Sequence, residues 1–197
     1  MTRIRIPKEL RIASSWLIYE YWMLKGLTQL LLQDDDLTEI GLLKNAVLES
    51  FLIHARALVD FFYRKPKCET DAVAGDYLDD IEKAYWEKHY SKVPDWFKNI
   101  RPRIDKGVAH ISYDRHKEAW DCGLIERKIS DTFDEFVKRV SNLDLLGTRW
   151  EKIKCNIRAG SESPVELPPF LMKGGILKTS FYSFPSPDWY PDEQEDN

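Results

Sequence analysis

The sequence predicts an all-α fold: an up-and-down bundle of four to five main helices, followed by an extended C-terminal tail rich in proline and aromatic residues. Apolar residues recur at spacings of three and four over several long segments, and no alternation of strands with helices is visible. Six of the ten prolines lie after residue 160, where they exclude regular helix. We therefore expect a helical domain over residues 1–158 and a tail over residues 159–197, with enough apolar content (43%) for a single core.

The first two helices are the longest. Pro7 suits a first helical turn, and a stripe of apolar residues predicts a helix over 7–33. Asp36 is in a position to cap a second helix over 37–64, and Pro66 follows its expected end. These two segments should form the centre of the bundle.

Three shorter helices are expected after them. They cover 76–90, 102–116 and 124–141, with a turn at 95–97 and with Pro102 at the start of the second of the three. In the first of the three, the side chains expected to face inward are Tyr77, Ile81, Ala84 and Tyr85.

Bulk features restrict the location of the protein. No apolar run is long enough to cross a bilayer, and the N-terminus lacks the apolar core of a signal peptide. The three cysteines lie far apart, without the spacing of a disulfide framework or a zinc site. We expect a cytoplasmic protein without membrane association.

Charge is unevenly distributed along the chain. The net charge is −4, but residues 88–117 contain eight Lys or Arg against three Asp, whereas residues 161–197 are strongly acidic. Such a basic segment can attract phosphate groups, although most charge runs are simply solvated faces.

The basic segment contains the sequence RIDKGVAHISYDR, residues 103–115. Arg103 and His110 are seven residues apart, so on a helix they share one face about 10.5 Å apart along the axis, with Lys106 and Gly107 between them. Metal-free RNA cleavage needs a group that titrates near neutral pH and fixed positive charge for the phosphorane. The glycine would allow a phosphate or another helix to approach closely.

This Arg103-x6-His110 pattern, late in a helical bundle, resembles the signature of the HEPN superfamily. The resemblance implies a metal-independent endoribonuclease of a bacterial toxin or anti-phage defence type. It also implies a homodimer in which two motifs face one cleft, with Arg103 and His110 as the catalytic pair.

Five further residues are candidates for contacting RNA: Lys106, Tyr113, Arg115, His54 and Arg56. His54 lies on the apolar stripe of the second helix, where a hydrogen-bonded core histidine is the common alternative to a second functional imidazole. Arg56 and Asp60 are an i,i+4 pair that either forms an ionic network on the flank of the helix or positions Arg103 or a ligand phosphate. The sequence has no metal-binding motif and no glycine-rich phosphate loop, so we expect neither a metal nor a cofactor.

Two alternatives to a ribonuclease remain open. The first is a non-catalytic interaction module that dimerises or docks a protein partner through its basic face and its aromatic tail. The tail contains Phe170, Phe181, Tyr182, Phe184, Trp189 and Tyr190, which is more aromatic surface than a solubilising tail needs. The second is a bundle that binds a nucleotide or another small molecule through the same basic segment.

Overall fold

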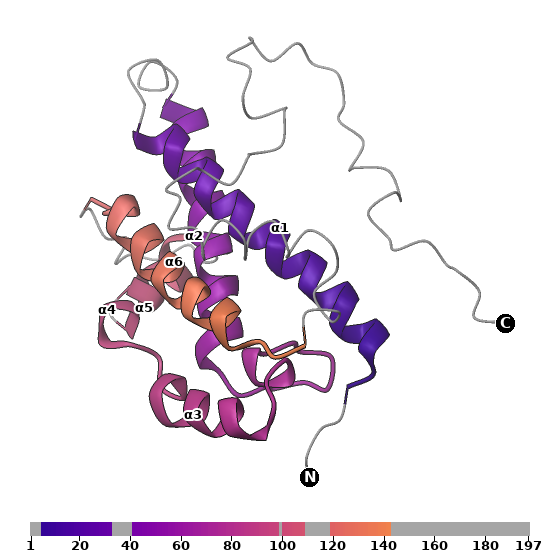
Figure 1. Ribbon diagram of the computed structural model, residues 1–197. Helices are drawn as coiled ribbons and strands as arrows, with labels where there is room; N and C mark the ends of the chain where they lie inside the picture. The colour runs from indigo at the N-terminus through magenta and orange to yellow at the C-terminus, as the bar shows by residue number, and fades with distance from the viewer. Residues whose placement is uncertain (1–4, 33–40, 99, 109–118, 143–197) are drawn as a thin grey trace, which may run out of the picture.

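A computed structural model describes residues 5–32, 41–98, 100–108 and 119–142 (Figure 1). This part of the chain contains helices and no strand, so the predicted all-α bundle is confirmed. The helices are α1 (Pro7–Leu32), α2 (Gly41–Tyr63), α3 (Asp80–Tyr90), α4 (Asp95–Lys98), α5 (Ile100–Val108) and α6 (Cys122–Arg139), with a 3-10 turn, η2, at Ala74–Asp76. The predicted tail over 159–197 and the proposed cap at Asp36 lie outside the described residues.

Helices α1, α2 and α6 pack together as the centre of the bundle, and α1 runs antiparallel to the other two (Figure 1). The Tyr21 ring of α1 stacks on Phe133 of α6, with ring centroids 3.8 Å apart. The core combines aliphatic side chains with large aromatic rings, and rings of this size contribute strongly to the energetics of burial. Its fully or nearly fully buried rings include Phe51, Phe62, Phe97, Phe133 and Phe136.

A polar seam fixes the register between α1 and α6. Glu126 accepts hydrogen bonds from the Lys25 ammonium and the Ser130 hydroxyl, both at 2.6 Å, and Ser130 accepts one from the Tyr21 hydroxyl at 3.1 Å. Burial raises the pKa of Tyr21, so this hydroxyl remains a donor. Each polar group in the seam therefore has a partner, as buried polar groups generally require.

Helix α3 differs from its predicted form. It begins at Asp80 because the Asp79 carboxylate caps it, accepting the backbone N–H groups of Ile81 and Glu82. The prediction that Ile81, Ala84 and Tyr85 face inward was wrong, because all three are exposed, Ile81 to 81%, and the buried residue of α3 is Trp86. The predicted burial of Tyr77 is confirmed, but this residue lies before the helix.

Helix α5 begins two residues before its predicted start at Pro102. Proline is tolerated there because the first N–H groups of a helix have no partner within the helix. The predicted turn at 95–97 is a single helical turn, α4, which buries Phe97. The side chain of Ile104 is only 2% exposed, so α5 packs its middle against the core and holds the neighbouring polar residues at the edge.

Helix α6 begins at Cys122, just after Asp121, whose carboxylate accepts the Leu124 N–H. None of the described helices is both long and apolar enough to span a bilayer.

Candidate functional site

Arg103 is half-buried on α5 and lies over the indole ring of Trp120, with its guanidinium carbon 4.2 Å from the ring centroid. Trp120 directly precedes the cap of α6, so two separate elements hold this arginine. Stacking uses the flat face of the guanidinium, whereas its N–H donors lie in the plane and point sideways. The contact therefore restrains the position of the guanidinium group.

An ionic cluster joins α5 to α2, and we call it the α2–α5 cluster: Arg56, Asp60, Arg64, Arg101 and Asp105. Asp60 Oδ1 lies 3.0 Å from Arg64 Nε and 3.2 Å from Arg101 Nη1. Asp105 pairs with Arg56 across the two helices, and its Oδ2 lies 3.6 Å from Arg101 Nε. The predicted pair of Arg56 and Asp60 is present, at 4.0 Å. The pairs Arg56–Asp105 and Arg101–Asp60 cross between the two helices and fix how α5 lies on α2.

Partial burial raises the pKa of Asp60, against the opposing effect of Arg101 and Arg56. The carboxylate therefore loses hydration on folding, and its guanidinium partners compensate for only part of that loss. Arg103 lies on another side of α5, because two residues on a helix are about 200° apart and the face that carries Arg101 and Asp105 is directed toward α2.

His54 is buried on the face of α2 that contacts α1. Its Nδ1 lies 2.6 Å from Glu20 Oε2, and the Tyr19 ring packs edge-on against it with centroids 5.8 Å apart. Arg56, two residues later, points toward α5 instead. The structure thus brings Arg56 to the motif helix and places His54 in the contact between α1 and α2.

The remaining predicted residues are only partly visible. Lys106 lies within α5, but its side chain is not among the described parts of the structure. His110, Tyr113 and Arg115 lie outside the described residues altogether. Arg103, Arg56 and His54 are therefore the predicted site residues whose side chains have a defined place.

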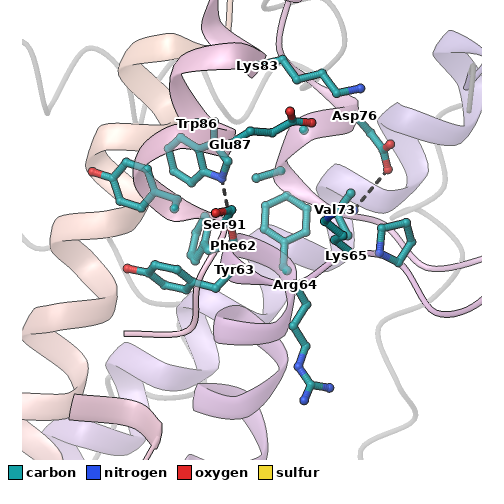
Figure 2. A pocket seen from close by; sticks show the side chains of 15 residues that line it. Phe62, Tyr63, Arg64, Lys65, Val73, Asp76, Lys83, Trp86, Glu87 and Ser91 are labelled. Atoms are coloured by element: carbon teal, nitrogen blue, oxygen red, sulfur yellow. Dashed lines mark hydrogen bonds between the residues drawn. The ribbon is translucent and has the colours of Figure 1, made fainter. Parts of the chain in front are cut away.

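A second feature was not predicted from the sequence. A pocket of about 430 Å³ opens where the end of α2 meets η2 and α3 (Figure 2). Its floor is aromatic, from Phe61, Phe62 and Trp86, and its rim carries charged side chains of both signs. Two features of the sequence could have indicated this pocket: the aromatic run at the end of α2 and the four-residue spacing of Trp86 and Tyr90. Both features are also typical of an ordinary hydrophobic core.

Within the described residues, no group of three or more His, Cys, Asp or Glu side chains is arranged to hold a metal ion. Comparison of the chain with protein-family models, curated proteins and solved structures gives no significant match. The resemblance to HEPN proteins rests on the motif within a helical bundle.

Proposed function

We propose that this chain is a HEPN-like helical-bundle protein that cleaves RNA without a metal ion, with Arg103 and His110 as its catalytic pair. The observation that supports this most is the position of Arg103, which stacks on Trp120 and lies on α5, the helix that the α2–α5 cluster anchors. A cation that is fixed before the substrate arrives needs little reorganisation to stabilise charge in a transition state.

The chemistry assigns one role to each member of the pair. His110 takes the proton from the 2′-hydroxyl or gives one to the leaving 5′-oxygen, because imidazole titrates near neutral pH. Arg103 donates hydrogen bonds to the non-bridging oxygens as negative charge builds up on the phosphorane. Lys106 and Arg115 add electrostatic attraction for the RNA backbone.

The test is cleavage of a single-stranded RNA or tRNA by the full chain in the presence of EDTA. Arg103→Ala and His110→Ala should each lower the rate by at least about a hundredfold, within the range for a lost catalytic group. Arg127→Ala and His89→Ala are matched controls, since both residues are exposed and lie on other helices, and they should cleave like the wild type. Wild-type protein that leaves these RNAs intact would overturn the proposal.

One observation favours a second function, an interaction module that forms a dimer. Trp16 on α1 and Ile53 on α2 are 56% and 53% exposed, and Tyr19 links the two helices by ring contacts with Trp16 and His54. Large apolar side chains gathered on one face are typical of protein contact surfaces.

Sedimentation velocity with the protein at about 50 μM should then show a dimer. Interfaces of ordinary size readily reach dissociation constants below this concentration. The double variant Trp16→Ser/Ile53→Ser should sediment as a monomer, whereas the control Leu124→Ser, on α6 and 45% exposed, should not change the dimer. A monomeric wild type would exclude this function.

A further inference from the structure

The pocket between α2, η2 and α3 has the size of a ligand site. Its volume of about 430 Å³ lies within the range of small-molecule sites, and its walls come from three elements that the bundle holds in place. It is separate from Arg103, because its lining residues belong to the end of α2, the segment around η2, and α3.

The floor of the pocket is suited to an apolar group. Trp86 and Phe62 are 4% and 3% exposed, and the Trp86 indole N–H donates to the Phe62 carbonyl oxygen at 3.0 Å (Figure 2). Tyr90 stacks on Trp86 with centroids 4.1 Å apart. The indole N–H is already used inside the protein and Tyr90 covers one face of the ring, so the small part of Trp86 that remains accessible offers no donor.

The rim carries charges of both signs, from Lys65, Lys83, Asp76 and Glu87. Asp76 is used within the loop, where its carboxylate accepts the Val73 N–H at 3.2 Å. In the described part of the chain, Lys65, Lys83 and Glu87 take part in no ion pair.

Arg64 also lines the pocket, but it pairs with Asp60, and Figure 2 shows its side chain directed away from the pocket. Since Arg64 is turned away, the four remaining charges of the rim sum to zero. A ligand with one charge would meet a like charge as well as an opposite one.

We propose that this pocket binds a small zwitterion with an apolar body, of the amino-acid or dipeptide class. The ammonium group lies at Glu87, near the C-terminal end of α2, where the helix dipole also favours positive charge. The carboxylate lies at Lys83 and Lys65, and the side chain lies against the apolar lining, where Tyr63 and Val73 are only half-buried. A ligand that carries both charges can pair with the lysines and with a carboxylate of the rim at the same time.

Calorimetric titration of the full chain tests the proposal with L-phenylalanine, 3-phenylpropionate and 2-phenylethylamine as probes. These compounds share an aromatic body and differ in which charges they carry. L-Phenylalanine should bind at least about tenfold more tightly than either singly charged probe, which is the effect of one charge-assisted hydrogen bond.

Two variants connect binding to the rim. Lys83→Met and Glu87→Gln should each weaken L-phenylalanine binding by about tenfold, since each removes one charge at the rim and leaves the aromatic floor intact. Lys88→Met is the matched control, an exposed lysine of α3 that does not line the pocket, and it should bind like the wild type. The proposal is overturned if L-phenylalanine shows no saturable binding up to about 10 mM, the weak end of the affinity scale. Equal binding by the wild type, Lys83→Met and Glu87→Gln would overturn it as well.

Discussion

The contact between Asp60 and Arg101 should contribute measurably to stability, because it joins α2 to α5 from a partly buried position. Arg101 Nη1 lies 3.2 Å from Asp60 Oδ1, and the side chains are 16% and 31% exposed. Exposed pairs are worth about 0.2–1 kcal/mol, and removing one partner of a fully buried pair costs about 3–5 kcal/mol. We therefore expect a coupling energy of about 1–2 kcal/mol between these two residues.

A double-mutant cycle measures this coupling through urea unfolding of the wild type, Asp60→Asn, Arg101→Met and the double variant. The control is the same cycle on Asp95 and Lys98, which are closer together, at 2.6 Å, but are 94% and 55% exposed. Solvent screening should make that coupling clearly weaker than the coupling between Asp60 and Arg101. If the coupling of Asp60 with Arg101 is no larger than the control, the α2–α5 cluster does not anchor the helix that carries Arg103.

Three further stability measurements follow from single contacts. Trp86→Phe removes the donor to the Phe62 carbonyl and should lower the unfolding free energy in urea by about 1–3 kcal/mol, whereas a loss below about 0.5 kcal/mol would contradict the bond. Asp121→Ala should cost about 1 kcal/mol by removing the cap of α6, and Asp121→Ser should restore most of it in thermal melts followed by circular dichroism. Burial raises the pKa of Cys122 from 9.0 to about 11, so the unfolded thiol ionises first and the unfolding free energy should fall as pH rises from about 9 toward 11. Cys122→Ala should make that fall shallower, and an unchanged slope would contradict the assignment.

The long helices could be predicted because their apolar stripes extend over many turns. The predicted helix over 7–33 agrees with α1 to within a residue, and α6 begins two residues before its predicted start. The short helix α3 was harder to predict, because the apolar residues of only a few turns are compatible with more than one buried face. Its true start depends on the Asp79 cap, and that cap turns Trp86 inward and leaves Ile81 exposed.

Among the contacts of the candidate site, those between residues close in the sequence could be predicted, and those between distant residues could not. The pair of Arg56 and Asp60 follows from their i,i+4 spacing, but Arg101 joins Asp60 from 41 residues away, and no local pattern indicates that contact. The stacking of Arg103 on Trp120 likewise brings together two segments whose packing is set by the whole bundle. A sequence pattern indicates which face of a single helix is apolar and which residues are neighbours along it. These contacts depend instead on which helices pack against each other.

The most direct test of the proposed ribonuclease is the chemical nature of the RNA ends that it makes. Attack by the 2′-oxygen on the adjacent phosphorus leaves a 2′,3′-cyclic phosphate and a 5′-hydroxyl, and this reaction needs an acid–base group and no metal ion. Wild-type protein in EDTA should yield those ends, and His110→Ala should yield none above background. Intact RNA with the wild type, or the same products at the same rate with His110→Ala, would contradict the account.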